Sequence, residues 1–191
     1  GNWTSVDVSA LITGSGVYDL AITTTSSSTM NFNSRDASVN RPELVIQTSA
    51  PVSTPTATPT LPPTLTATRT PTATSVITAT FTPTQIATIP GTLTFTALAD
   101  ARVSQALPST NYGTSTNLQA GASAGTAQIS YIRFTVSGLN GSIQSVKLRV
   151  FCTTNGTANG PAIYLANSTW TESGTGGVTW NAQPALLSGA M

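Results

Sequence analysis

The chain has 191 residues, which is enough for one sandwich-sized β domain together with a linker. Only 7% of the residues are charged, no histidine is present and the formal net charge is +1, so nucleic acids and anionic membrane surfaces are poor candidates as partners. The sequence also lacks the run of about 18 apolar residues that a membrane-spanning helix requires, so membrane insertion is not expected.

The first region, residues 1–50, alternates apolar and polar residues with a period of two. In the segment Trp3–Val8, for example, Val6 and Val8 fall on one face and Asp7 falls on the other. No window of this region repeats every 3.6 residues, so helices are not expected. The pattern predicts strands at residues 3–8, 17–22, 30–32 and 43–47.

The middle region, residues 51–90, is rich in threonine and proline. It holds eight of the 12 prolines of the chain, and Arg69 is its one charged residue. This composition favours an extended stalk in the polyproline II conformation that carries O-linked glycans. The threonines predicted to carry them are Thr54, Thr56, Thr58, Thr60, Thr64, Thr66, Thr68, Thr70, Thr72, Thr74, Thr78, Thr80, Thr82, Thr84 and Thr88.

These threonines all have even numbers, and the odd positions between them are mostly apolar. A period of two is typical of a strand with one threonine face, although a duplicated Thr-Pro-Thr-Ala unit accounts for it as well. The proline-free stretch at residues 74–82 is rich in β-branched side chains and is the part best suited to a sheet. The middle region is therefore predicted to be an extended linker or a strand.

The last region, residues 91–191, returns to the β pattern. Its strongest segments are Ile129–Val136 and Ile143–Phe151, and the Asn140–Gly141 step between them predicts a turn. Further strands are predicted at residues 92–98, 162–165 and 177–180. Many short strands separated by Gly, Asn and Ser turns are typical of an all-β fold, a sandwich or jelly roll.

Two groups of short motifs stand out in the β-rich regions. The first group lies at residues 100–103, 111–121, 131–134, 146–150, 170–172 and 178–181, and the second lies at residues 3–8, 33–36 and 41–46. In number and order within each group, these motifs resemble the DNRLRE-type β-sandwich module. That family is grouped with the carbohydrate-binding modules of extracellular bacterial and archaeal proteins.

The order of the two groups is the reverse of the family's order. Compared with the family, residues 1–50 resemble the C-terminal half of a module and residues 91–191 resemble the N-terminal portion. The resemblance thus implies a β-sandwich module split into two halves around a long Thr/Pro-rich segment. Three arrangements are compatible with this order: one repeat cut from a tandem array, halves completed by neighbouring chains, or a permuted monomer that closes on itself.

Half a sandwich exposes unpaired strand edges and half a core, so each half needs a partner. Completion from chain to chain is a head-to-tail contact, which propagates into a fibre. The favoured hypothesis is a structural subunit or repeat of an extracellular glycosylated filament, joined head-to-tail to identical neighbours. The alternative is a carbohydrate-binding module of a larger secreted enzyme or adhesin, which rests on family analogy.

Several residues indicate how the surface and the core are built. The apolar run around Cys152 predicts a buried structural thiol, and Arg35 beside Asp36 predicts a structural ion pair. The sequons that are candidates for N-linked glycans begin at Asn2, Asn140, Asn155 and Asn167. The chain begins within a predicted strand, so it is expected to be a piece of a longer protein.

No catalytic site is predicted. Without histidine, neither a Ser-His nor a Cys-His pair can form, and zinc sites of the Cys/His type are excluded. The six acidic residues show no cluster in the sequence that recommends a glycosidase pair, and no organic cofactor is expected.

Two kinds of binding residue remain as candidates. Asp100 and the loop of Asn111 would supply oxygen ligands for a calcium ion, although a strand-end aspartate and an Asn-Tyr-Gly turn explain them more simply. Trp3, Trp170 and Trp180 are the candidates for stacking on sugars, although tryptophans in the strands of a sandwich are usually part of the core.

Overall fold

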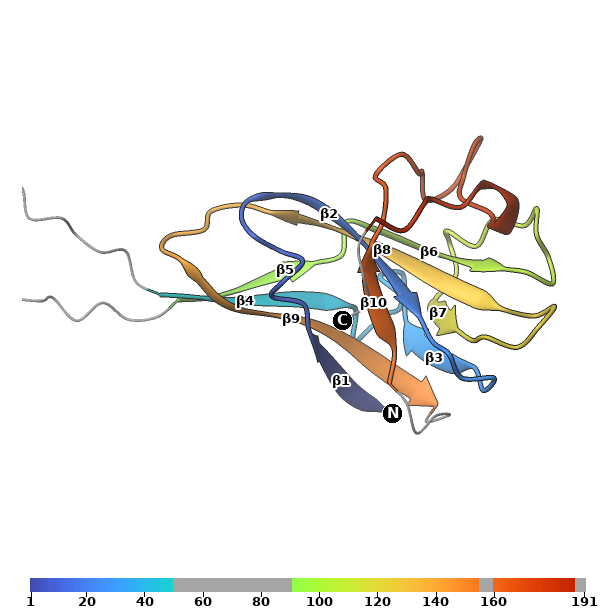
Figure 1. Ribbon diagram of the computed structural model, residues 1–191, viewed down its shortest axis with the longest axis horizontal. Coiled ribbons are helices and arrows are strands. Elements are labelled where there is room, and N and C mark those ends of the chain that lie inside the picture. Colours follow the sequence, from blue (N-terminus) through green and yellow to red (C-terminus); the bar gives the residue numbers. More distant parts are fainter. Residues whose placement is uncertain (50–90, 155–159, 188–191) are drawn as a thin grey trace, which may run out of the picture.

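The computed structural model describes residues 1–49, 91–154 and 160–187, and it consists of two antiparallel β-sheets that pack face to face (Figure 1). In these residues the helical structure is the short 3-10 turn η1 (Trp180–Ala182), and no helix is long and apolar enough to cross a membrane. The prediction of an all-β sandwich is confirmed. The predicted strand at residues 74–82 and the threonines listed above lie outside the described residues.

The first sheet has six strands arranged around one long strand. The strand β9 is long enough to pair with β4 and then β3 along one edge and with β1 along the other. The strand β5 flanks β4, and β7 flanks β3. The strands are β1 (Asn2–Asp7), β3 (Met30–Asn33), β4 (Glu43–Thr48), β5 (Gly91–Thr96), β7 (Asn117–Ala120) and β9 (Ile143–Thr154).

The second sheet has four strands in the order β10-β2-β8-β6. They are β10 (Ala162–Leu165), β2 (Gly16–Thr23), β8 (Gln128–Val136) and β6 (Ala99–Ser104). The longest pairing joins β2 to β8, from Gly16 opposite Val136 to Ile22 opposite Ser130.

The two β-rich regions of the sequence interleave in both sheets. The strand β4 lies between β5 and β9, β3 lies between β9 and β7, and β2 lies between β10 and β8. Each strand of residues 1–49 therefore pairs with strands of residues 91–187 of the same chain. Among the described residues, the two portions therefore pair with each other. Completion of one chain's sandwich by neighbouring chains stays a prediction.

The main hydrophobic core lies between the sheets and follows the alternation of the strands. In β8, for example, Ile132 and Phe134 point into this core, whereas Tyr131 points to the opposite side of the sheet. Cys152 is also buried here, as the apolar run around it predicted. Burial of these alternate side chains is the main source of stability of the sandwich.

A second hydrophobic cluster covers the outer side of the second sheet. Ala21, Tyr131 and Val103 of the strands pack there against Trp170 and Val178 of the C-terminal segment. The second sheet is thus buried on both faces, which explains why consecutive residues of β2 are inaccessible although a strand with one wet face would alternate.

Two of the predicted strands differ from the structure. The predicted strand at residues 177–180 is wrong: Gly177 makes one isolated bridge to Thr171, and the turn η1 begins at Trp180. Gly174 and Gly176 adopt positive φ angles just before it, so the chain turns too sharply to form a ladder. The strand predicted at residues 92–98 ends at Thr96, because the chain then crosses into β6 of the other sheet.

Candidate functional site

The three tryptophans predicted to stack on sugars lie in three different environments. Trp170 is only 5% exposed, and its Nε1–H donates a 2.6 Å hydrogen bond to Oδ1 of Asp19. Arg133 donates to the same oxygen at 2.8 Å, and its guanidinium lies 4.7 Å from the centre of the Trp170 ring. Trp170 therefore fastens the C-terminal segment to the second sheet and has no face free for a ligand.

Trp180 is half-buried and packs against the second hydrophobic cluster. Trp3 is half-buried as well, but it lies on β1 at the edge of the first sheet, directly opposite Phe151 of β9. Because the flanking Cys152 points into the core, Phe151 and Trp3 point to the outer face of that sheet. The structure does not bring the three tryptophans together on one face.

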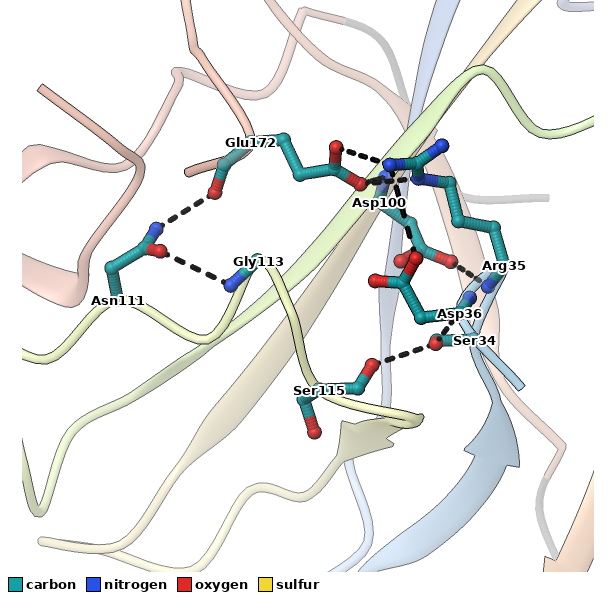
Figure 2. Close-up of polar contacts among 8 residues, drawn as sticks. All are labelled: Ser34, Arg35, Asp36, Asp100, Asn111, Gly113, Ser115 and Glu172. Carbon is teal, nitrogen blue, oxygen red and sulfur yellow. Dashed lines mark hydrogen bonds and ion pairs between the residues drawn. The ribbon is translucent and has the colours of Figure 1, made fainter. Parts of the chain in front are cut away.

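A polar cluster joins three distant parts of the chain (Figure 2). Arg35, in the loop after β3, donates two hydrogen bonds to the carboxylate of Glu172 in the C-terminal segment, at 2.6 and 2.8 Å. One of these carboxylate oxygens also accepts the backbone N–H of Asp100 in β6 at 2.8 Å. The side chain of Asp100 in turn accepts the backbone N–H of Arg35 at 2.6 Å.

Burial dominates the electrostatics of this cluster. Asp100 is 1% exposed, and desolvation together with the neighbouring carboxylates of Glu172 and Asp36 raises its pKa to about 7, against the opposing hydrogen bond from Arg35. The hydrogen bonds to Glu172 raise the pKa of the Arg35 guanidinium, which stays charged. Asp36 is more exposed and lies 3.8 Å from that guanidinium, so the predicted Arg35–Asp36 pair exists but is the weaker of the two.

Asn111 holds the peptide that carries Glu172 in place. Its Nδ2 donates to the backbone carbonyls of Glu172 and Val178, both at 2.8 Å, and its Oδ1 accepts the N–H of Gly113 at 3.2 Å. Gly113 has to be glycine, because a Cβ built there would lie 1.9 Å from the carbonyl oxygen of Glu172. The side chain of Asn111 is thus fully used in positioning the loop.

The predicted calcium ligands do not form a pair in the structure. Asn111 binds the backbone, whereas the carboxylates of Asp36, Asp100 and Glu172 come together, with oxygens within 4.8 Å of one another. Carboxylate oxygens are the ligands that calcium takes, but Arg35 already neutralises Glu172 here. The calcium site stays a prediction, and the contacts themselves describe a polar clamp.

The prediction missed Glu172 as a member of this cluster. The stretch that contains it, residues 170–172, was among the family-like motifs, but no signal in the sequence relates it to Arg35 at a separation of 137 residues. Only the docking of the C-terminal segment on the second sheet brings the two side chains together.

The predicted glycosylation sites are accessible to different degrees. Asn2 and Asn140 are exposed, whereas Asn167 is half-buried and its Oδ1 accepts the backbone N–H of Thr169 at 3.1 Å. Asn155 lies outside the described residues. Attachment of glycans to these residues, and to the threonines of residues 51–90, stays a prediction.

Among the depressions on the described surface, two that are open to solvent bear on the candidate residues. The larger, about 540 Å³, lies between the loop at residues 12–15 and the turn at residues 139–144. The smaller, about 390 Å³, lies beside Trp3. Trp3 therefore lines one of these two depressions, and Trp170 and Trp180 line neither.

Comparison with known proteins gives one match. The family model described as carbohydrate-binding module family 96 matches residues 91–191, which is just over half of the chain. The match includes β5 to β10 together with Asp100, Asn111 and Glu172, and it leaves out β1 to β4. No curated protein and no solved structure matches the chain.

Proposed function

The chain belongs to carbohydrate-binding module family 96, and we therefore propose that it binds a polysaccharide outside the cell, as the non-catalytic module of a larger secreted protein. The family match is the observation that carries the proposal. Binding modules of this kind deliver no chemistry of their own, so the absence of histidine from the sequence fits the role.

The architecture supports the same proposal. Two packed sheets give a rigid scaffold whose outer faces present side chains at fixed spacing, which suits recognition of an extended polymer. The low content of charged residues leaves most of the polar surface to Thr, Ser, Asn and Gln, whose hydroxyl and amide groups both donate and accept hydrogen bonds, as sugar hydroxyls do.

The hypothesis of a filament subunit, which the sequence analysis favoured, has less support than carbohydrate binding. Its main argument was that each half of the sandwich lacks a partner, but in the described residues the two portions already pair within one chain. We therefore place carbohydrate binding ahead of the structural role.

Affinity gel electrophoresis of the full chain tests the proposed function. The protein is run through native gels that contain one polysaccharide each, drawn from uncharged and acidic types, with serum albumin as the reference protein. Retardation in at least one gel, followed by a saturable signal in titration calorimetry, is the expected result. A chain that runs like the reference in every gel would overturn the proposal.

A further inference from the structure

The outer face of the first sheet carries an organised set of side chains around Trp3. The register places Trp3 of β1 opposite Phe151 of β9, Arg149 of β9 opposite Glu43 of β4, and Glu43 opposite Thr96 of β5. These side chains lie on one face of four neighbouring strands, and each of them is exposed or half-buried.

Trp3 is held in a fixed orientation on this face. Its ring meets the ring of Phe151 edge-to-face, with the centres 5.6 Å apart, and the guanidinium of Arg149 lies 4.6 Å from its centre. Arg149 is itself anchored by Glu43, whose carboxylate accepts its Nη1–H at 2.8 Å. An aromatic ring that is positioned before binding loses little conformational entropy when a ligand stacks on it.

The depression beside Trp3 is open to solvent and has a mixed polar and apolar lining, as a surface site for one sugar unit of a polymer would have. Its volume is about 390 Å³. Asn40 at its rim has a φ of +54°, a conformation that asparagine tolerates, and the next residue, Arg41, is tied back by its Nε–H to the carbonyl of Ala37 at 2.8 Å. The lining residues are Trp3, Ser38, Val39, Asn40, Arg41, Glu43 and Thr96.

The charges on this face largely cancel. Glu43 is paired with Arg149, and Asp7 of β1 lies directly opposite Lys147 of β9. Arg41 is the one remaining charge among the residues that line the depression. This face therefore offers no row of cations to bind a polyanion. An uncharged sugar ring has C–H groups on its face, which can stack on Trp3, and hydroxyl groups at its edge, which can bond to the polar side chains around Trp3.

We propose that the depression on the outer face of β1, β9, β4 and β5 binds a pyranose unit of an uncharged polysaccharide, with the sugar ring stacked on Trp3 and its hydroxyl groups bonded to Glu43, Asn40 and Arg41. This inference rests on the proposed function, because it assigns the site and the ligand class of the same binding activity. It also distinguishes Trp3 from Trp170 and Trp180, which pack in the second hydrophobic cluster.

Titration calorimetry and affinity gels with the full chain test the site. The probes are glucomannan, xylan, galactan and laminarin as uncharged polysaccharides and alginate as an acidic one, each at low and at high salt. Trp3→Ala is expected to weaken binding of the uncharged ligand about tenfold or more, because aromatic anchors carry a large share of binding energy. Trp3→Tyr, which keeps a ring, is expected to restore most of it.

A second pair of variants controls for damage to the fold. Thr96→Arg fills the depression, whereas Thr92→Arg makes the same change on the same strand and the same exposed face, outside the depression. We expect Thr96→Arg to weaken binding as much as Trp3→Ala does and Thr92→Arg to leave it unchanged, with the same midpoint of thermal unfolding in both variants.

The outcomes separate the two proposals. If the unmodified chain binds and both Trp3→Ala and Thr96→Arg bind equally well, the site is wrong while the proposed function stands. If the chain binds alginate alone, with an affinity that falls steeply with salt, the uncharged ligand class is wrong. If the chain binds none of the polysaccharides, the proposed function itself fails, and this inference with it.

Discussion

Arg35 and Glu172 form a two-pronged ion pair, with hydrogen bonds of 2.6 and 2.8 Å, between residues that lie 137 positions apart. Arg35 follows β3 in the first sheet, and Glu172 belongs to the segment that covers the second sheet, so the pair ties the first sheet to that segment (Figure 2).

Glu172→Gln is expected to lower the free energy of unfolding by about 1–3 kcal/mol, because it removes a charge-assisted pair of hydrogen bonds whose acceptor is mostly buried. Urea unfolding followed by tryptophan fluorescence measures the change. The matched control is Glu43→Gln, which breaks the more exposed pair with Arg149 and is expected to cost about 0–1 kcal/mol. Equal losses in the two variants would contradict the assigned role of the Arg35 pair.

The stability of the protein is expected to fall as the pH rises from about 4 to about 7. The pKa of Asp100 is raised from 3.8 to about 7 in the folded chain, so within this window the folded state keeps a proton that the unfolded state has lost. The free energy of unfolding then declines by at most about 1.4 kcal/mol per pH unit and levels off above pH 7.

Denaturant unfolding at half-unit steps of pH checks this prediction. Asp100→Asn, which cannot ionise, is expected to remove the decline, whereas Asp36→Asn at the more exposed carboxylate should keep it. Stability that stays constant or rises between pH 4.5 and 7 in the unmodified protein would contradict the raised pKa of Asp100.

Asp19→Ala is expected to destabilise the protein by about 3–5 kcal/mol, because Arg133 and the indole N–H of Trp170 would both lose the same acceptor at a buried position. Trp170→Phe keeps the ring but loses the donor, and it should cost less, about 1–3 kcal/mol. Thermal unfolding by circular dichroism measures both. Limited proteolysis should cut the C-terminal segment of Asp19→Ala faster, and an unchanged rate of cleavage would contradict its anchoring role.

Gly113→Ala is expected to cost about 1–3 kcal/mol, since its Cβ would overlap the carbonyl oxygen of Glu172 and force the loop apart. Gly14→Ala is the control, because nothing lies within 4 Å of a Cβ at that position and its φ is not positive. Differential scanning calorimetry of the two variants measures the effect. Equal midpoints of thermal unfolding would show that the loop rearranges around the Cβ of Gly113→Ala without loss of stability.

Separate chains covering residues 1–49 and residues 91–191 are expected to be unfolded alone and to form a folded complex when mixed, because every strand of the first portion pairs with strands of the second. Cooperative unfolding of the mixture, measured by circular dichroism, checks this. If residues 91–191 fold cooperatively alone, the two portions are independent. Light scattering of the intact chain tests whether the same pairing also occurs between chains. A monomer agrees with pairing within one chain, whereas polymers would support the filament hypothesis.

The period-two alternation along strands such as β4 and β9 was sufficient, together with the turn residues between segments, to predict the fold class and most of the strands, because in a strand neighbouring side chains point to opposite faces. The burial of Cys152 followed from the apolar run around it. The absence of histidine likewise excluded Ser-His and Cys-His catalytic pairs and zinc sites of the Cys/His type. Such inferences need only local pattern and composition.

Alternation says which residues share a face but not what covers that face. Trp3 and Trp170 therefore looked equivalent in the sequence, although one lies on the outer face of the first sheet and the other is sealed against the second. The meeting of Arg35, Asp100 and Glu172, and the tight approach of Gly113 to Glu172, likewise depend on how the C-terminal segment packs on the second sheet. Those contacts join residues far apart in the chain, so only the tertiary structure could establish them.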